Sequence, residues 1–316
     1  MIARTLSTTA ALICAVPADT LAQDRPGSSG VTAREVAGAA DVLRLRVAPR
    51  RIWAPRSFEM VRGVVLFEAI IGGRQATVLF DSGTGKTAID TAFARAIELN
   101  LDKATGYAAT GSGPIPFSRT ASTTFEVPRA FTLSGRLVSF DMRSISDALG
   151  QRIDAILGAD ALAMMAVMIR PKTGQISFIS SGAIKFSGPD VIYLPLSPQG
   201  LVEATVNGSA TTLMIDTGYS GSVRLTERLW NKIFGDDAPN RSSSVATTAD
   251  GGQVRAMSAY GNISLGNSPG INAPVSSGYR SIDSKRGLLG TGILLRGDLL
   301  IDVPDGKLAL ISKRNR

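Results

Sequence analysis

The chain repeats part of itself, and any fold proposed for it must accommodate two similar halves. FEAIIGGRQATVLFDSGTG (67–85) aligns without a gap to VEATVNGSATTLMIDTGYS (202–220), so that Asp81 falls on Asp216, 135 positions later. Because the match includes glycines and acidic residues as well as apolar positions, it is more specific than a shared hydrophobic pattern.

Two further pairs of blocks follow in the same order. DAILGADAL matches RGLLGTGIL, and MIRPKTGQISFI matches LIDVPDGKLALI; these blocks span 154–162, 286–294, 168–179 and 300–311. Ordered blocks at nearly constant spacing indicate a duplicated domain. We expect a first lobe over 61–180, a connector over 181–194, a second lobe over 195–312 and a basic tail over 313–316.

Each half has the pattern of a β-rich domain. Apolar runs of strand length are bounded by Gly, Pro and Asn, and the turn pairs Gly72-Gly73 and Asn207-Gly208 predict hairpins at matching places. Glycine-rich stretches at 110–113 and 250–252 predict the tips of a second hairpin in each half. Helical patterns are few and short, over 91–99, over 226–234 and for a turn or two after each Leu-Gly. The expected fold is all-β, with two β-barrel lobes and few short helices.

The N-terminal region has the composition of a targeting segment. Arg4 precedes the apolar run AALICAV, and Thr20-Leu21-Ala22 offers small residues where a signal peptidase cleaves, so residues 1–22 are interpreted as a secretory signal. The protein is then periplasmic or secreted, and the single cysteine, Cys14, leaves with the signal. Residues 23–60 match neither half, and could be a linker, a pro-segment or an extra edge element.

The composition excludes several kinds of chemistry. The chain contains no histidine, which excludes Ser-His and Cys-His nucleophile pairs and zinc sites built on imidazole. We expect no metal and no cofactor. The formal net charge is +8, but it is scattered, and two Trp and five Tyr do not form a basic stripe interleaved with aromatics. Nucleic-acid binding is therefore disfavoured, and no stretch has the length of a membrane span.

A phosphate-binding loop is the competing interpretation of TVLFDSGTGKTAID (77–90). Such a loop ends in Gly-Lys-Ser/Thr and needs another glycine five residues before the last one. Taking Gly85-Lys86-Thr87 as the end places Phe80 at that position. The equivalent stretch of the second half is Ser220-Gly221-Ser222, without a lysine. The part that repeats is Asp-Ser/Thr-Gly, so we assign the chemistry to it.

FDSGTG and IDTGYS, together with ILGADAL and LLGTGIL, resemble the motifs of aspartic proteases. The likeness is nearest to the retropepsin-like group, with both halves on one chain as in the pepsins, and it covers about 61–312. It implies that each lobe supplies one catalytic aspartate, Asp81 and Asp216. Two carboxylates held about 3 Å apart share one proton and activate a water for peptide hydrolysis. The resemblance assigns that proton to the pair and not to either residue.

The resemblance also implies roles for the neighbouring residues. Ser82 and Thr217 would hydrogen-bond across the interface, and the glycines that follow them would allow a sharp turn. The residues expected to support the pair are Ser82, Gly83, Thr84, Thr217, Gly218, Gly158 and Gly290. Thr84 suits the fourth motif position, whereas Tyr219 departs from it. The tentative substrate-binding residues are Tyr219 and the hairpin-tip residues Ser112, Gly113, Gly251 and Gly252.

Three functions are compatible with these residues. The first is an aspartic endopeptidase that takes a polypeptide substrate and works as a monomer containing an intramolecular pseudo-dimer. The alternative is a catalytically inactive module of the same fold that binds peptides or envelope partners. A third is a carboxylate-based hydrolase of cell-wall glycans, although its two carboxylates would be more widely spaced in an inverting enzyme.

Overall fold

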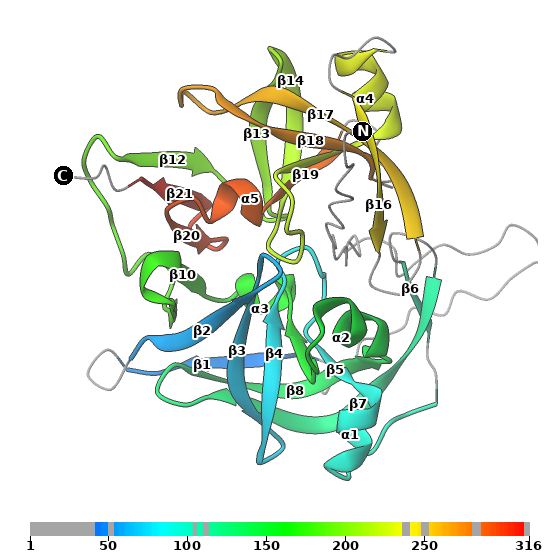
Figure 1. The fold of residues 1–316 in the computed structure, drawn as a ribbon. Coiled ribbons are helices and arrows are strands. Elements are labelled where there is room, and N and C mark those ends of the chain that lie inside the picture. Colours follow the sequence, from blue (N-terminus) through cyan, green and yellow to red (C-terminus); the bar gives the residue numbers. More distant parts are fainter. Residues whose placement is uncertain are drawn as a thin grey trace, which may run out of the picture.

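The computed structural model describes residues 42–49, 54–103, 106–109, 114–235, 241–247, 253–279 and 286–312. These residues are mostly strands, and they build two lobes, drawn one above the other in Figure 1. The helices are short: α1 (Thr91–Ala96), α2 (Arg143–Leu149), α3 (Ala159–Leu162), α4 (Glu227–Phe234) and α5 (Thr291–Leu294). The all-β, two-lobed fold expected from the sequence is confirmed.

The first lobe is a closed sheet. Its strands lie in the order β3-β4-β9-β5-β8-β7-β6, and β3 also pairs with β7. The bounds are β3 (Val64–Ile71), β4 (Arg74–Phe80), β5 (Ala88–Asp90), β6 (Gly106–Ala109), β7 (Pro114–Val127), β8 (Phe131–Phe140) and β9 (Ala155–Leu157). The closing pair leaves fewer unpaired strand edges.

The second lobe repeats this order strand for strand, as β13-β14-β19-β15-β18-β17-β16, again with an additional pairing, β13 with β17. The bounds are β13 (Leu201–Val206), β14 (Ser209–Asp216), β15 (Val223–Thr226), β16 (Ser242–Thr247), β17 (Gln253–Leu265), β18 (Ile271–Tyr279) and β19 (Arg286–Gly290). The matching sequence blocks therefore occupy matching places in the two lobes. Helix α2 precedes β9, whereas no helix is described between β18 and β19.

A third group of strands joins the lobes. Its order is β12-β21-β20-β10-β11-β2, and β2 continues into β3 of the first lobe. The bounds are β12 (Val191–Pro195), β21 (Lys307–Ile311), β20 (Asp298–Asp302), β10 (Ala166–Arg170), β11 (Gln175–Ile179) and β2 (Arg56–Val61). Met168 of β10 lies directly opposite Leu300 of β20, its equivalent in the repeat. The two lobes are thus related by an approximate two-fold axis through this pair.

Part of the region before residue 61 belongs to the folded body. Strand β1 (Arg44–Val47) pairs with β8, and β2 pairs with both β3 and β11. The sequence left residues 23–60 open between a linker, a pro-segment and an edge element. Within the described part of that range, β1 is an edge strand, whereas β2 lies between β3 and β11 and has a partner on each side. The predicted domain boundaries and the role of a pro-segment remain predictions.

The sequence explains the hairpins that open each lobe. The turns between β3 and β4 and between β13 and β14 have positive φ at both central residues: 55° and 80° at Gly72 and Gly73, 49° and 77° at Asn207 and Gly208. Such turns match the twist of paired strands and require Gly or Asn. Thr77 donates to Glu68 in the first hairpin, and Thr212 donates to Glu203 in the second. The predicted hairpins are confirmed.

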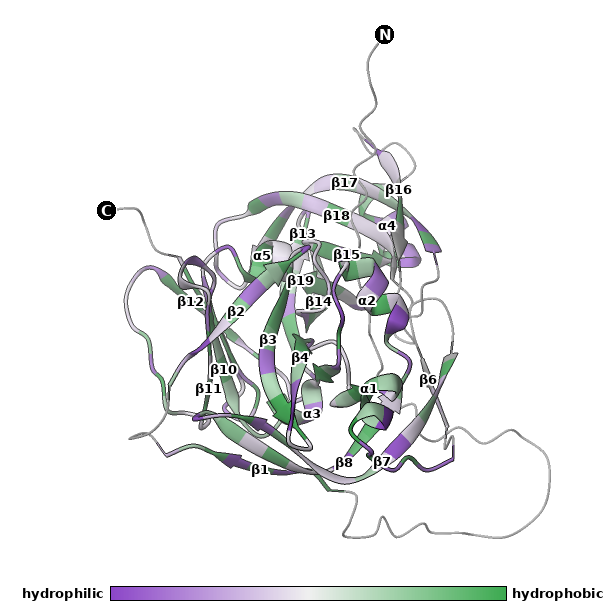
Figure 2. Ribbon diagram, turned by 60° about the horizontal axis from the view of Figure 1, so that its bottom comes forward, coloured by the Kyte–Doolittle hydropathy of each residue, from purple (hydrophilic) through white to green (hydrophobic). Residues whose placement is uncertain are grey.

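One hydrophobic cluster extends through both lobes. It includes Phe80, Val167 and Phe178 from the first half and Leu213 and Ile301 from the second. Figure 2 shows hydrophobic residues along β10, in the joining sheet, while hydrophilic residues are prominent on the peripheral strand β1. Because the cluster is shared, burial of apolar surface holds the lobes together. Among the described residues, no helix has the length and hydrophobicity to cross a membrane.

Candidate active site

Asp81 and Asp216 lie at equivalent ends of β4 and β14. Each of these strands pairs in parallel with the strand that carries the Leu-Gly block, so that Phe80 lies opposite Leu157 and Asp216 lies opposite Gly290. Parallel pairing brings both sequence motifs of one lobe to the same end of its sheet. The segments that follow, residues 81–87 and 216–222, are called the first loop and the second loop.

The two loops interlock at their glycines. A Cβ atom added to Gly83 would lie 2.5 Å from Cγ of Asp216, and one added to Gly218 would lie 2.5 Å from Cγ of Asp81. Each carboxyl group therefore rests against the Cα of the opposite loop. Neither glycine has a positive φ, so it is the close approach, and not the backbone conformation, that requires glycine here.

Ser82 and Thr217 tie the loops together by reciprocal hydrogen bonds. The Ser82 N–H donates to Oγ1 of Thr217, which itself donates to the Phe80 carbonyl, both at 2.9 Å. In the reverse sense, the Thr217 N–H donates to Oγ of Ser82 at 3.0 Å, and that hydroxyl donates to the Ile215 carbonyl at 2.9 Å. All four bonds are buried, so the positions of the two loops are strongly coupled.

We expect Thr217→Ala to destabilise the protein by about 2 kcal/mol or more. The change leaves a buried N–H at Ser82 and a buried carbonyl at Phe80 without partners, and each loss costs about 1–3 kcal/mol. Thr212→Ala, on the strand that leads into the second loop, is the matched control, because its hydroxyl bonds to the exposed carboxylate of Glu203. Urea unfolding of both variants measures the difference; equal destabilisation would contradict the coupling.

The aspartates are fully buried, with 0% of either residue exposed. Asp81 accepts hydrogen bonds at Oδ1 from the N–H groups of Gly83 at 2.9 Å and Thr84 at 3.2 Å, and at Oδ2 from the Thr84 hydroxyl at 2.7 Å. Asp216 accepts one at Oδ1 from the Gly218 N–H at 3.0 Å. Its Oδ2 is buried and accepts no hydrogen bond from an amide or hydroxyl donor among the described residues, while the two carboxyl groups are close enough to hydrogen-bond to each other.

Burial raises the pKa of both carboxyl groups. For Asp216 the pKa lies well above the ordinary value, first because of burial and then because of the charge of Asp81. For Asp81, burial raises the pKa, while hydrogen bonds from Thr84 and Gly83 oppose the rise. Two buried carboxyl groups that influence each other in this way hold a proton at a pH where exposed carboxyls would be ionised.

These pKa shifts predict that stability falls as the pH rises. Because the folded pKa values exceed the unfolded ones, the folded state binds more protons than the unfolded state in that range. The stabilisation is complete below the ordinary carboxyl pKa and is lost as the pH rises through the folded values. Urea unfolding at a series of pH values measures this slope, which Asp216→Asn should flatten; an unchanged slope would contradict the assignment.

The Leu-Gly blocks support the loops from behind. Leu157 and Leu289, in the strands that pair with β4 and β14, are fully buried and add apolar surface to this region. A Cβ at Gly158 would lie 2.6 Å from the Lys86 carbonyl oxygen, and one at Gly290 would lie 2.2 Å from that of Gly221. In both lobes this glycine therefore lets the loop backbone pack directly against the second motif.

Tyr219 does not present an open surface to a substrate. It is 4% exposed, and its ring lies close to Gly221 and Gly290, where added Cβ atoms would meet ring atoms. The hydroxyl is 3.0 Å from Oγ of Ser276, and burial raises its pKa. The ring thus belongs to the interior of the second lobe, and the tentative substrate-binding role of Tyr219 finds no support in its position.

The predicted hairpin tips fall outside the described residues, and this includes Ser112, Gly113, Gly251 and Gly252. The strands that lead to them do pair: Ala109 lies opposite Pro114, and Thr247 lies opposite Gln253. Figures 1 and 2 both show β6 and β16 on one side of the molecule and β12 on the other. The role of the tips in substrate binding remains a prediction.

The sequence analysis missed residues that appear in one half only. The partly buried carboxyl of Asp160 accepts hydrogen bonds from the Thr87 N–H and hydroxyl at 2.8 and 2.7 Å, which fixes the end of the first loop. The Thr291 hydroxyl donates to the carbonyl of Gly63 at 2.6 Å, which connects the second lobe to the turn before β3. No repeated pattern could have revealed them, because the position equivalent to Asp160 is Gly292.

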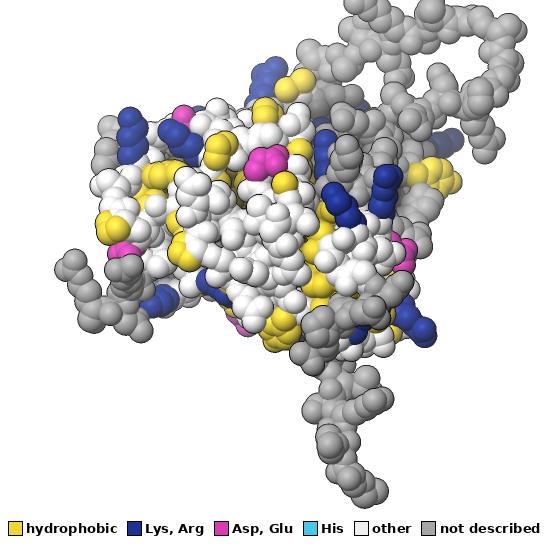
Figure 3. Space-filling view, turned by 90° about the horizontal axis from the view of Figure 1, so that it is seen from above, with side chains coloured by type: hydrophobic (Ala, Val, Ile, Leu, Met, Phe, Trp, Pro, Cys, Tyr) yellow, Lys and Arg dark blue, Asp and Glu magenta, His cyan; other side chains and the backbone are white. Residues whose placement is uncertain are grey.

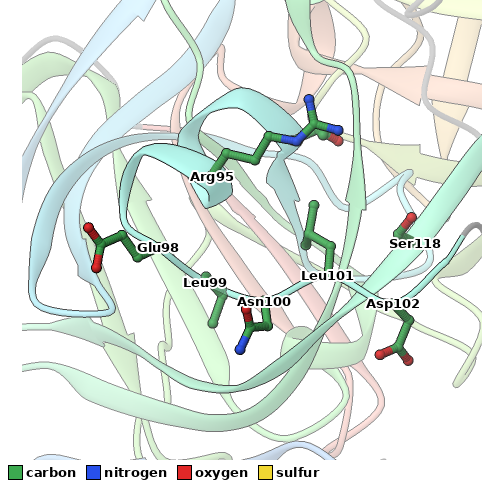
Figure 4. Close-up of a pocket in the computed structure, with 8 residues that line it drawn as sticks. Arg95, Glu98, Leu99, Asn100, Leu101, Asp102 and Ser118 are labelled. Atoms are coloured by element: carbon green, nitrogen blue, oxygen red, sulfur yellow. The ribbon is translucent and has the colours of Figure 1, made fainter.

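Other parts of the surface are weaker candidates for a functional site. A pocket of about 590 Å³ lies between α1, the segment that follows it and β7. Arg95, Glu98 and Ser118 are among its lining residues (Figure 4). None of the predicted site residues lines it. On the face seen in Figure 3, lysine and arginine side chains are separated by polar and hydrophobic ones. In the described ranges, no three or more Asp, Glu, Cys or His side chains are grouped to hold a metal ion.

Comparison with known proteins gives a family match for part of the first half of the chain. Residues 67–161 match the family model described as aspartyl protease. The matched stretch contains Asp81, the first loop and the Leu-Gly block at Gly158. It supports a protease-type hydrolase with a polypeptide substrate. No curated protein matches the chain.

Proposed function

We propose that this protein is an aspartic endopeptidase in which Asp81 and Asp216 together activate a water molecule. The observation that carries the proposal is the interlocking of the loops, which sets each buried carboxyl against the glycine of the other loop. The family match at 67–161 supports the same function for the first half. We further propose that Ser82 and Thr217 hold the two carboxyls in place.

The reaction follows from a pair that carries one proton. The ionised carboxylate removes a proton from water, and the protonated partner stabilises the oxygen of the scissile carbonyl. A side-chain imidazole plays no part, because the chain contains no histidine. The strand order shared by the lobes supports an origin by duplication, with one catalytic residue on each half. We propose that the enzyme works as a monomer in the periplasm or outside the cell, after removal of residues 1–22.

The test is cleavage of an unbiased peptide library by the protein, followed by mass spectrometry. We expect wild-type protein to cut internal peptide bonds, and Asp216→Asn to leave the library intact. Binding of a statine-type inhibitor provides a second readout. A partner-binding module without catalysis predicts identical libraries for both proteins, and a glycan hydrolase predicts release of sugars from cell-wall material instead.

A further inference from the structure

The two loops differ at the residue after the glycine. In the first loop, the hydroxyl of Thr84 donates to Oδ2 of Asp81 at 2.7 Å, in addition to the backbone donors at Oδ1. An ionised carboxylate accepts such bonds more strongly than a neutral carboxyl group. The first loop is therefore built to hold a negative charge on Asp81.

The second loop lacks this donor. Tyr219 occupies the position of Thr84, and its hydroxyl contacts Ser276 Oγ at 3.0 Å instead of Asp216. Oδ2 of Asp216 is left buried and accepts no hydrogen bond from an amide or hydroxyl donor among the described residues, so the carboxyl of Asp81 is its neighbour. A buried charge on an oxygen that accepts no hydrogen bond is costly, whereas a protonated oxygen there can donate to its neighbour.

The position of Tyr219 is itself supported by its surroundings. A Cβ at Gly221 would lie 2.2 Å from the tyrosine hydroxyl, so glycine is required at that position of the second loop. The guanidinium of Arg224, a residue that is 1% exposed and whose charge influences Tyr219, donates to the carbonyls of Ser277 at 3.1 Å and Gly278 at 3.3 Å. The first half has Lys86 and Ile89 at the positions of Gly221 and Arg224. Gly221 thus leaves room for the ring, and the tyrosine hydroxyl contacts Ser276 and not the aspartates.

We propose that the residue after each glycine divides the two roles: Thr84 keeps the negative charge on Asp81, and Tyr219 leaves the shared proton on Asp216. The assignment rests on the proposed function, because it describes how the same pair works. Asp81 is then the general base and Asp216 the general acid. Thr84 is a positioning residue that acts through Asp81.

The charged groups around the pair are compatible with this division. Lys86, in the first loop, is exposed, and Asp160 of α3 directs one oxygen to Thr87. Arg224 of β15 and the Tyr219 hydroxyl lie on the side of Asp216, and the charges of Arg224 and Asp216 influence each other. Although Arg224 would favour ionisation of Asp216, the pKa of Asp216 remains well above its ordinary value through burial and the charge of Asp81.

The division specifies each proton transfer. Asp81 removes a proton from water, the water oxygen bonds to the scissile carbonyl carbon, and the Asp216 proton moves to the carbonyl oxygen. The product of this step is a neutral gem-diol. When it collapses, the C–N bond breaks, Asp81 returns its proton to the leaving nitrogen, and Asp216 recovers a proton from one hydroxyl. The pair ends in its starting state.

The deciding variant is Thr84→Val, which removes the hydroxyl and keeps the shape. If Asp81 carries the charge, ionisation of the neutral pair becomes harder, and the acidic limb of the kcat/KM profile moves up by about one to two pH units. The basic limb, which reports loss of the Asp216 proton, should not move, because Asp81 is ionised both before and after that step. Thr84→Ser, which keeps the hydroxyl, should restore the wild-type profile.

Each outcome of this experiment supports or overturns the assignment. If only the basic limb moves, the negative charge lies on Asp216 and the two roles are reversed. If neither limb moves, Thr84 does not determine which aspartate carries the charge. If Thr84→Val does not fold, Tyr219→Thr tests the same point. This substitution gives Asp216 a hydroxyl donor, which stabilises the doubly ionised pair. The basic limb of the kcat/KM profile should therefore move to lower pH, and an unchanged basic limb would overturn the assignment. Wild-type protein that cleaves nothing at any pH would instead refute the proposed function.

Discussion

Replacing either Asp81 or Asp216 with asparagine is expected to lower kcat/KM for peptide cleavage by at least about 100-fold, the usual contribution of a general acid or base. An amide of the same shape can neither remove a proton from water nor transfer one to the carbonyl oxygen or the leaving nitrogen. Both substitutions should have the same effect, since a pair that shares one proton fails when either member is lost. Cleavage of one defined peptide from the library measures the loss.

The matched control is Asp147→Asn, because Asp147 is an exposed carboxylate on α2. It should cleave at the wild-type rate. The two active-site variants should remain folded at neutral pH, since an amide removes a buried ionisable group whose charged form is costly. Wild-type cleavage by Asp81→Asn or Asp216→Asn would show that the pair does not perform the chemistry.

Adding a single methyl group to either loop glycine should be almost as damaging. In Gly218→Ala the new Cβ would lie 2.5 Å from Cγ of Asp81, and in Gly83→Ala it would lie 2.5 Å from Cγ of Asp216. Atoms cannot remain so close, so the opposite carboxyl must move. A displacement of about 1 Å can cost about 100-fold in rate, and we expect kcat to fall by that amount in each variant.

Ser220→Ala is a suitable control for this experiment, because it alters the same loop without adding a Cβ. It should retain most of the activity. Circular dichroism and urea unfolding show whether the glycine variants still fold, which separates a displaced carboxyl from a lost structure. A folded Gly218→Ala variant with the wild-type kcat would contradict the interlocked arrangement of the loops.

The repeat in the sequence was enough to predict the main features of the fold. Two matching series of strand and turn patterns led to the all-β, two-lobed fold, and the matched Asp-Ser/Thr-Gly motifs selected Asp81 and Asp216. Helix boundaries were predicted less well. The pattern predicted a helix over 91–99, but α1 ends at Ala96, and Glu98 lies in the left-handed region. Helix α2, which no repeated pattern marks, was not predicted.

Features that depend on side-chain direction could not be predicted. A tyrosine after Asp-Thr-Gly can point toward a substrate or into its own lobe, and only the contacts at Gly221 and Ser276 decide between them. Arg224 is similar: a basic residue within a short apolar strand is usually exposed, yet the carbonyls of Ser277 and Gly278 satisfy it in the interior. Both residues lie in one half only, where comparison between the halves gives no guidance.

The pairing of β10 with β20 has a consequence for how the protein is made. Strand β10 ends at Arg170, but its partner β20 begins only at Asp298, near the C-terminus. A ribosome must therefore synthesise the chain at least as far as β20 before the seam between the lobes can close. Until then, Asp81 has no counterpart held against it. Under the proposed mechanism, a chain that lacks β20 is therefore expected to be inert as a protease.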